Sequence, residues 1–402
     1  GTATFAGLNV NKIGTYTLTP STTVSGVSTL PASSAFTVSP NVINTAHSTV
    51  SVLASTVSSS TSTTLTLQAK DIYDNNLTAG GSTIVFTQSD GTSTGNIGVA
   101  SYTSNGIYTA TFTGMIAGTA TTIGATINSS AVTWTPLPTI IVIFGAATQF
   151  DTVSTTTQNV MVNTLATAPS IRIRDANNNP VIGRSVIFAV TGGGGIGTGL
   201  NQSTDSSGFA TVSSWTVGTA TGINNNTMTA ATAGLSTLTF YASGAPGFIT
   251  TASSSVSVLA SIISSSTSTT LTLQAKDAWN NNLTTGGSTI VFITGSGTST
   301  GTITPVTASY IGNGQYTSSF NGIIAGTART ISASIGGSLV TWTPLPTIIV
   351  VAGAAVSMSA VSSISQSTGI MVSTSIAPAN LPAVFVYDAN NNPVSGTNVT
   401  FA

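Results

Sequence analysis

The sequence contains no cysteine and no glutamate, and only 4% of its 402 residues are charged, where about 25% is usual. Without cysteine, neither disulfides nor thiolate metal sites can stabilise the chain. Seven Lys and Arg residues against eight acidic residues leave a formal net charge of −1. So few basic residues argue against nucleic acid as a partner and against polybasic membrane binding, because both need clustered Lys and Arg.

Long apolar runs are also missing. The longest ones, at residues 140–147 and 348–356, have the length of a strand and fall far below the about 20 residues of a membrane helix, so membrane insertion is not expected. The chain begins at Gly1 without a signal peptide, and we expect it to be a processed chain or a piece of a longer one. Hydrophobic residues still make up 40% of the sequence, which is enough to build cores.

Short alternating runs rich in Thr, Val and Ile, separated by Gly, Asn, Asp and Ser, predict an all-β fold. In residues 65–70 (LTLQAK), every second residue from Leu65 is apolar. Such a strand has one buried and one solvated face, as in an antiparallel sandwich. No helical pattern with caps stands out anywhere in the chain.

One phrase recurs along the chain. An Asp followed by several Asn residues and then by a strand-like run ending in Phe begins at Asp71, Asp175, Asp277 and Asp388. Residues 61–70 and 267–276 both read TSTTLTLQAK, and residues 133–142 and 341–350 are also identical. Repetition at this spacing predicts small modules stacked in a line.

The repeats divide the chain into units of about 100 residues, the size of an immunoglobulin-like sandwich. We expect the C-terminal part of a module at 1–41, a type A module at 42–142, a type B module at 143–247, a type A repeat at 248–350, and the N-terminal part of a type B module at 351–402. The predicted fold class is therefore a linear tandem array of immunoglobulin-like antiparallel β-sandwiches. The incomplete ends have two explanations: a slice of a longer array, or strand complementation between subunits of a head-to-tail filament.

Three motifs carry a resemblance to a known family. Residues 175–181 (DANNNPV), followed by Gly183 and a VIF strand, resemble the bacterial immunoglobulin-like repeats of the invasin and intimin type. Residues 205–211, with an Asp-x-x-Gly turn before a strand, resemble the second hallmark of these repeats, and the Ala-Gly-Thr segments at 117–119 and 325–327 resemble the third. The resemblance covers nearly the whole chain and implies rigid extracellular stalks of adhesins and other surface proteins.

These observations predict a structural subunit or segment of an extracellular fibre, filament or cell-surface stalk that self-assembles through its modules. The alternative is an adhesin that binds glycans or a host protein through exposed aromatic residues or an unseen tip. An enzyme is not expected, because general acid–base chemistry needs poised carboxylates or histidines. The acidic residues here are scattered mostly in turns, and His47 is the single histidine.

Two residue patterns are candidate chemical sites. Asp175, Asn177 and Asn179 have the Asp-x-Asn-x-Asn spacing that opens some calcium loops. A hairpin turn capped by its own Asx side chains is the favoured interpretation, because no acidic residue follows to close a cage. No cofactor is expected, with calcium as the candidate exception. Lys70 and Lys276 recur before an Asp, as in modules with a Lys–Asn crosslink, but the strand alternation points them outward.

Aromatic residues at exposed positions are candidate interface residues. Tyr73 and Trp279 occupy matched turn positions, and Phe385 and Tyr387 stand at outward strand positions, which suggests a surface covered by another module or chain. The expected partners are copies of the chain or further repeats of it, with glycan or host-surface contact as a further candidate. Asn-x-Ser/Thr sequons, which are candidate glycosylation sites, begin at Asn76, Asn128, Asn201, Asn225, Asn282 and Asn398.

Overall fold

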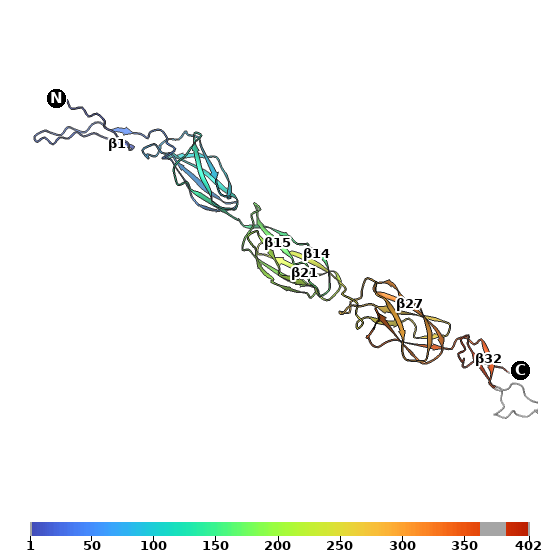
Figure 1. Ribbon diagram of the computed structural model, residues 1–402. Helices are drawn as coiled ribbons and strands as arrows, with labels where there is room; N and C mark the ends of the chain where they lie inside the picture. Colours follow the sequence, from blue (N-terminus) through green and yellow to red (C-terminus); the bar gives the residue numbers. More distant parts are fainter. Residues whose placement is uncertain (1, 362–382, 401–402) are drawn as a thin grey trace, which may run out of the picture.

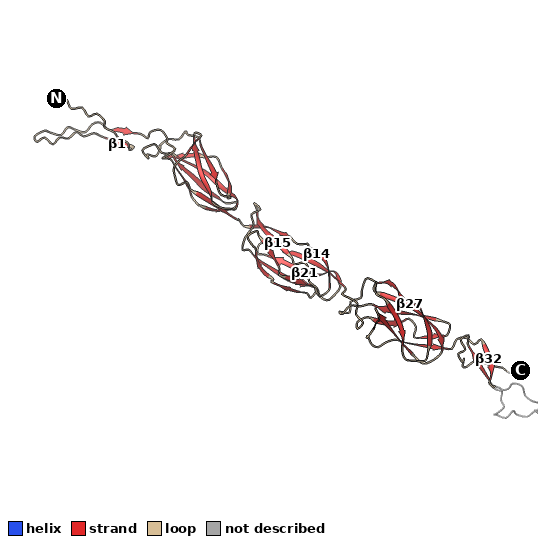
Figure 2. Ribbon diagram, viewed as in Figure 1, coloured by secondary structure: helices blue, strands red, loops and turns tan. Residues whose placement is uncertain are grey.

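The protein is described by a computed structural model that covers residues 2–361 and 383–400, and none of these residues lies in a helix. Accordingly, the described part of the chain has no helix that could cross a membrane. Figure 1 shows the modules following one another in a line, with the chain ends at opposite ends of it. Figure 2 shows that the regular structure consists of strands. The predicted all-β tandem array is confirmed.

The first complete sandwich is called module A1, and its core residues lie between Val50 and Val142. One sheet has the order β3-β5-β9-β7 with β8 against β9, and the other has the order β11-β10-β12-β4 with β6 against β10. The bounds are β3 Thr49–Val52, β4 Thr56–Ser58, β5 Ser62–Gln68, β6 Ile84–Ser89, β7 Thr94–Ile97, β8 Ser101–Ser104, β9 Ile107–Ile116, β10 Thr121–Ile127, β11 Ser130–Ala131 and β12 Thr139–Ile143.

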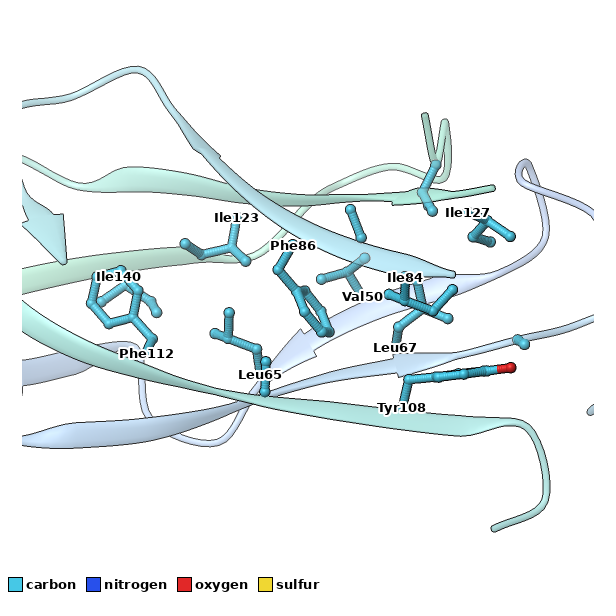
Figure 3. Close-up of a cluster of buried hydrophobic side chains, with 14 of the residues drawn as sticks. Val50, Leu65, Leu67, Ile84, Phe86, Tyr108, Phe112, Ile123, Ile127 and Ile140 are labelled. Atoms are coloured by element: carbon cyan, nitrogen blue, oxygen red, sulfur yellow. The ribbon is translucent and has the colours of Figure 1, made fainter. Parts of the chain in front are cut away.

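Strand alternation produces the core of module A1. Leu65, Leu67 and Ala69 are fully buried, whereas the residues between them face outward and are only partly covered, as the alternating pattern predicts. Figure 3 shows side chains of the two sheets, among them Phe86 and Phe112, meeting between the layers. Each fully buried side chain of this size contributes about 1.5–3 kcal/mol, so the module has a substantial core of its own.

The next sandwich, module B1, has its core residues between Ile171 and Ala242, with Trp215 fully buried. Its sheets have the orders β13-β15-β19, β14-β22-β21-β16-β18 and β17-β20. The bounds are β13 Ala147–Thr152, β14 Thr157–Met161, β15 Ser170–Asp175, β16 Ser185–Gly192, β17 Ile196–Thr198, β18 Asn201–Ser203, β19 Phe209–Thr211, β20 Ser214–Thr216, β21 Gly222–Ala231 and β22 Leu238–Ala245.

Module A2, with core residues between Val256 and Val350, repeats module A1 with one difference. A pair between Val291 and Thr307 joins its two sheets into one path, β23-β25-β28-β27-β26-β29-β31-β24, with β30 against β29. The bounds are β23 Ser255–Val258, β24 Ile262–Ser264, β25 Ser268–Gln274, β26 Ile290–Thr294, β27 Thr300–Gly312, β28 Gln315–Ile324, β29 Arg329–Ile335, β30 Ser338–Leu339 and β31 Thr347–Val351.

A short hairpin lies at each end of the described chain. At the N-terminal end β1 (Gly14–Tyr16) pairs with β2 (Phe36–Val38), and at the C-terminal end β32 (Ser357–Ala360) pairs with β33 (Val384–Tyr387). The first hairpin resembles the last hairpin of module B1, since Gly14 pairs with Val38 as Gly222 pairs with Gly244. The second corresponds to the β13–β15 pair with which module B1 begins.

Candidate functional site at the joints between modules

The repeated Asp phrase lies where one module meets the next. Its carboxylates are almost completely buried: the exposed fraction is 1% for Asp71, 1% for Asp175, 0% for Asp277 and 2% for Asp388. A buried carboxylate is costly unless hydrogen bonds compensate for the lost water. The donors that surround these carboxylates therefore decide what the phrase does.

Asp175 shows the arrangement between modules A1 and B1. Its Oδ1 accepts hydrogen bonds from the backbone N–H groups of Asn177 and Asn179, both at 2.9 Å, which closes the turn. Its Oδ2 accepts from the N–H of Gly145 in the linker at 2.8 Å and from the Asn179 side-chain amide at 2.9 Å. One carboxylate thus fastens the turn, the linker and the Asn side chain together.

Asn179 then reaches into module A1. Its Nδ2 donates to the carbonyl of Met115 at 2.7 Å, and the N–H of Ala117 donates back to its Oδ1 at 2.9 Å. A side-chain amide carries one acceptor and two donors, so it pairs with this backbone much as a neighbouring strand would. We call the Asp and the Asn four residues after it the clamp.

The clamp occurs at each of the four joints within the described residues. The clamp Asn residues are Asn75, Asn179, Asn281 and Asn392. They donate, at 2.7–2.8 Å, to the carbonyls of Asn11, Met115, Thr219 and Ile323 in the preceding part of the chain. The N–H groups that donate back are those of Ile13 at 3.3 Å, Ala117 at 2.9 Å, Thr221 at 3.4 Å and Ala325 at 2.7 Å.

Hydrogen bonding keeps the clamp carboxyls ionised in acid. Burial raises the pKa of Asp71, but the hydrogen bonds that Asn75, Asn41 and Tyr73 donate outweigh burial and lower this pKa to about 2. The pKa values of the other clamp carboxyls are lowered in the same way, because burial is again outweighed by the surrounding donors. The clamp is therefore a charged acceptor satisfied by neutral donors, and hydrogen bonds of this kind are stronger than neutral ones.

The residue two positions after the clamp Asp divides the joints into two kinds. Where the chain leaves a type A module, at what we call the exit joints, this residue is Asn. Asn177 Nδ2 donates to Ser59 Oγ at 2.7 Å and to Ser60 Oγ at 3.0 Å. The second exit joint repeats the arrangement, with Asn390 donating to Ser265 Oγ at 3.2 Å and Ser266 Oγ at 2.7 Å.

Where the chain enters a type A module, at the entry joints, the same position carries an aromatic residue. These residues are Tyr73, 47% exposed, and Trp279, 40% exposed. Lys12 Nζ donates to the Tyr73 carbonyl at 2.8 Å, and the Trp279 ring lies against Gly247 of the linker. The structure thus places both of these candidate interface residues at a joint.

The candidate calcium loop has its oxygens turned toward donors. N–H groups surround the Asp175 carboxylate, and the positive ends of these dipoles oppose a cation. Asn177 and Asn179 donate across the joint to module A1, so their side chains are engaged there. Among the described residues, no group of three or more metal-ligating His, Asp, Glu or Cys side chains comes together. In this turn, the Asp and Asn side chains serve the joint.

The remaining candidate residues lie apart from one another. His47 Nδ1 is 2.9 Å from Asp74 Oδ1, and Lys276 Nζ donates to the exposed Asn280 side chain at 3.1 Å. The rings of Phe385 and Tyr387 lie 5.9 Å apart on β33, and Phe385 is 49% exposed. The interface expected for these two aromatic residues stays a prediction.

The sequons differ in how free their Asn side chains are. Asn225 donates through Nδ2 to the Ala220 carbonyl at 2.8 Å, and its Oδ1 accepts from the Gly244 N–H at 3.0 Å. A glycan on Nδ2 would compete with this hydrogen bond. The other sequon residues are exposed, namely Asn76, Asn128, Asn201, Asn282 and Asn398, and remain candidate glycosylation sites.

Sequence reasoning identified the phrase but did not predict the task of the Asn four residues after its Asp. The separation between this Asn and its carbonyl acceptor varies: it is 64 residues for Asn75 and Asn179, 62 for Asn281 and 69 for Asn392. The signal that could have found the pair is therefore the Ala-Gly-Thr hallmark and not a fixed spacing. The Ala-Gly-Thr segment at 117–119 begins with the very residue whose N–H donates to Asn179. Two sequence hallmarks thus meet at a single joint.

Comparisons with known proteins concern the fold. No protein-family model and no curated protein matches the sequence. Among solved structures, the chain is similar to the Escherichia coli adhesin FdeC, with 18% identity, 78% of this chain and 99% of that chain covered, and a TM-score of 0.42. It is also similar to InvD of Yersinia pseudotuberculosis, with 16% identity, 87% and 73% covered, and a TM-score of 0.26.

Invasin, a bacterial integrin-binding protein, is similar at 17% identity with a TM-score of 0.39. The match covers 76% of this chain but only 60% of invasin. Identities this low concern the fold alone. The sheet order and cores of each module establish that fold independently. The chain is an all-β tandem array whose structural neighbours are the immunoglobulin-like domains of adhesins of the invasin and intimin type.

Proposed function

We propose that the chain is a load-bearing segment of an extracellular fibre or cell-surface stalk. The observation that carries this proposal is the clamp, which joins each module to the preceding one at every joint of the described residues. A binding or catalytic function depends on one particular surface, whereas a mechanical function depends on the same connection being repeated between all modules. The repeated clamp therefore favours a mechanical function. The adhesin and surface-layer proteins among the structural neighbours support a surface location.

The clamp suits a pulling force because it ties three backbone segments at one point. Separating modules A1 and B1 requires loss of the Asn179 bonds to Met115 and Ala117. Freeing the linker also requires loss of the Gly145 bond to Asp175. The Asn179 amide and the Gly145 N–H both donate to the buried Asp175 carboxylate. Pulling either of them away leaves polar groups buried without a partner, which is costly. In this proposal, the chain is not an enzyme, because its buried acids serve these structural bonds.

Single-molecule stretching of the full chain, combined with antibody labelling of intact source cells, tests the proposal. We expect antibody binding at the cell surface and successive unfolding events of about 100 residues each. Asn179→Ala should lower the force at which the A1–B1 pair comes apart. The matched control is Asn201→Ala, which changes an exposed Asn of module B1 away from the joint. An intracellular location, or equal forces in both variants, would contradict the proposal.

We further propose that the chain self-assembles by strand complementation, in which strands of one copy complete a module of the next. In module B1, Ile173 on β15 is fully buried. The matching strand β33 leaves its inward Val386 only half-buried, and Met358 beside it is 64% exposed. The N-terminal hairpin exposes Leu18 at 47%, beside a cavity of about 660 Å³ lined also by Phe5, Leu8 and Leu30. The N-terminal hairpin of one chain corresponds to the last strands of a type B module, and the C-terminal hairpin of another corresponds to the first strands. Together they would supply strands from both parts of such a module.

Sedimentation of the purified chain over a range of concentrations tests complementation. We expect head-to-tail oligomers that grow with concentration and are blocked by Leu18→Asp or by Met358→Asp. Leu53→Asp is the control, because Leu53 is 81% exposed in module A1, away from both ends. A chain that stays monomeric at every concentration would refute complementation, while the stalk function would then rest on further modules of the same chain.

The second candidate function is adhesion, and exposed aromatic residues at an entry joint favour it. Phe248, which follows Gly247 in the chain, is 80% exposed, and Trp279, whose ring lies against Gly247, is 40% exposed. Aromatic rings of this kind bury apolar area when they contact a ligand. A glycan array probed with the full chain and with Trp279→Ala separates the two functions. Reproducible binding that disappears in the variant supports the adhesin, and binding to no glycan supports a purely mechanical segment.

A further inference from the structure

We infer that stiffness alternates along the chain: the exit joints hold two modules as one rigid unit, and bending is concentrated at the entry joints. This inference extends the proposed mechanical function, and it concerns the geometry of joints alone. It is carried by differences that recur in both exit joints and in both entry joints of the described chain.

Both exit joints share a side-chain bridge beyond the clamp, whereas the first entry joint has an exposed bond from Lys12 Nζ to the Tyr73 carbonyl. Asn177 bridges from the clamp turn of module B1 to Ser59 and Ser60 of module A1. At the second exit joint, Ser265 Oγ also donates to the clamp carboxylate Asp388 at 2.6 Å. An exit joint is therefore fastened at two separate points, the clamp Asn and the Asn–Ser bridge. Two fixed points oppose rotation about either one.

Steric closeness distinguishes the joints as well. A Cβ built on Gly145 would lie 2.7 Å from the Ser59 carbonyl oxygen, so only glycine fits without a backbone shift. At the second exit joint, a Cβ on Gly353 would lie 3.2 Å from the Ser265 carbonyl oxygen. The first entry joint carries Asn41 at the matching position, and Asn41 donates its N–H to Asp71 just as the glycines donate to their clamp Asp. The second entry joint also has a glycine, Gly247, but the atoms nearest to a Cβ built on it belong to the side chains of Trp279 and Asp277. The close approach of two backbones is therefore found at the exit joints.

The clamp itself is tighter at the exit joints. The N–H groups that donate to the clamp Asn lie 2.9 Å and 2.7 Å away at Ala117 and Ala325. At the entry joints, the corresponding distances are 3.3 Å from Ile13 and 3.4 Å from Thr221. Hydrogen bonds of N–H to O are most favourable near 2.9–3.0 Å, so the entry clamps hold mainly through their shorter carbonyl bond.

The cause lies in the module that precedes each joint. In module A1, Thr61 donates its N–H and hydroxyl to the Ser58 carbonyl, and this turn presents Ser59 and Ser60 to the next module. In module B1, Thr164 makes the same two bonds to Met161, so its turn is the equivalent one.

The residues that the B1 turn presents are different. Val162 occupies the place of Ser59 and is fully buried, and Asn163 takes the place of Ser60. Because a valine offers no hydroxyl to the next module, an entry joint after a type B module cannot form the Asn–Ser bridge. Trp279 covers the linker with its ring instead.

Paired spin labels on the full chain test this inference, and the absence of native cysteine makes such labels unique. Cysteines at the exposed positions Ser101 and Ser185 span an exit joint, and those at Ser185 and Ser309 span an entry joint. Pulsed electron paramagnetic resonance should give a distance distribution at least about twofold narrower across the exit joint. Equal widths, or a broader distribution across the exit joint, would overturn the inference.

Asn177→Ala in the Ser101/Ser185 background separates the bridge from other causes. The distribution across the exit joint should broaden toward that of the entry joint, while Trp279→Ala should leave it unchanged. Ser59→Ala with Ser60→Ala removes the same bridge from the opposite module and should give the same broadening. If neither change broadens the distribution, the bridge does not cause the stiffness. Surface labelling of cells is independent of this result, so the failure of one proposal is distinguishable from the failure of the other.

Discussion

Module B1 is flanked by one joint of each kind, and the two joints share a fastening while differing in what surrounds it. At both, a buried Asp accepts the N–H of a linker glycine, Gly145 on one side and Gly247 on the other. At the exit joint, a second Asn bridges to two serines, whereas at the entry joint Trp279 rests on the linker. The same clamp residues can thus occur in joints of different tightness, because neighbouring positions set how closely the two modules approach each other.

The largest loss of stability is expected from removing the clamp Asp, which both kinds of joint share. Asp175→Ala and Asp277→Ala each leave several buried donors without an acceptor, which should lower the free energy of unfolding by roughly 3 kcal/mol. Calorimetry of the full chain measures the change. Asp205→Ala is the control, because the exposed Asp205 accepts from Ser207 and Phe209 in an ordinary turn, and removing it should cost about 1 kcal/mol. If the free energy of unfolding falls equally in all three variants, an Asp at a joint stabilises the fold no more than an Asp in an ordinary turn.

The next effect separates the joints. Gly145→Ala places a methyl group against the Ser59 carbonyl and should cost roughly 1–3 kcal/mol. Gly247→Ala meets the edge of the Trp279 ring at 3.1 Å, and this half-exposed ring can shift. It should cost less than about 1 kcal/mol. Thermal unfolding of the two variants checks the order, and the reverse order would show that the exit joint is not the more closely packed one.

Acid should act on both kinds of joint. The folded-state pKa values of the clamp carboxyls are lowered, to about 2 for Asp71, and an unfolded Asp titrates near about 3.9. The clamps therefore stabilise the fold fully above the unfolded pKa, and this stability is lost as pH falls toward and through the folded pKa. Unfolding followed from pH 5 to pH 1.5 should show it. The Asp71→Asn variant should be less stable at neutral pH, and its stability should decrease less steeply as pH falls. If the decrease is as steep as in the unchanged chain, the clamp carboxyl is not the cause of the acid sensitivity.

The smallest effect is expected from salt. The bonds of Asn179 and Asn281 to the preceding module join neutral groups, and the net charge of the chain is −1. Salt screens interactions between charges and leaves neutral hydrogen bonds almost unaffected. Raising NaCl from low to molar concentration should leave the unfolding temperature and any assembly of the chain essentially unchanged. Dissociation at high salt would reveal an ionic contact between chains.

The sequence predicted the fold through local rules. Alternation around Leu65 and Leu67 identified buried faces because side chains of a strand point alternately to its two sides. The Asp phrase was recognised as a turn because an Asx side chain can accept its own backbone N–H groups, as Asp175 does from Asn177. These are interactions between residues a few positions apart, and a sequence displays them directly.

The joints were less accessible from the sequence. Tyr73 and Trp279 were predicted as interface residues from their turn position and lie at joints, but Asn179 was assigned to a turn or a calcium loop. Its partner Met115 lies 64 residues away. No local rule links these two residues, since the link arises only when two finished sandwiches are placed end to end. Asn177 was likewise assigned to a turn or a calcium loop, and its bond to Ser59 was not predicted because Ser59 belongs to another module.

The sequence by itself determined the repeat, the strands and the turn chemistry, since each follows from periodicity and from contacts between near neighbours. Only the tertiary structure decided that the turns fasten one module to the next and that the fastening differs between exit and entry joints. The physical reason is that a hydrogen bond between modules depends on where folded surfaces meet. Ser59 and Val162 occupy equivalent turn positions, and the module boundary turns this small difference into two kinds of joint.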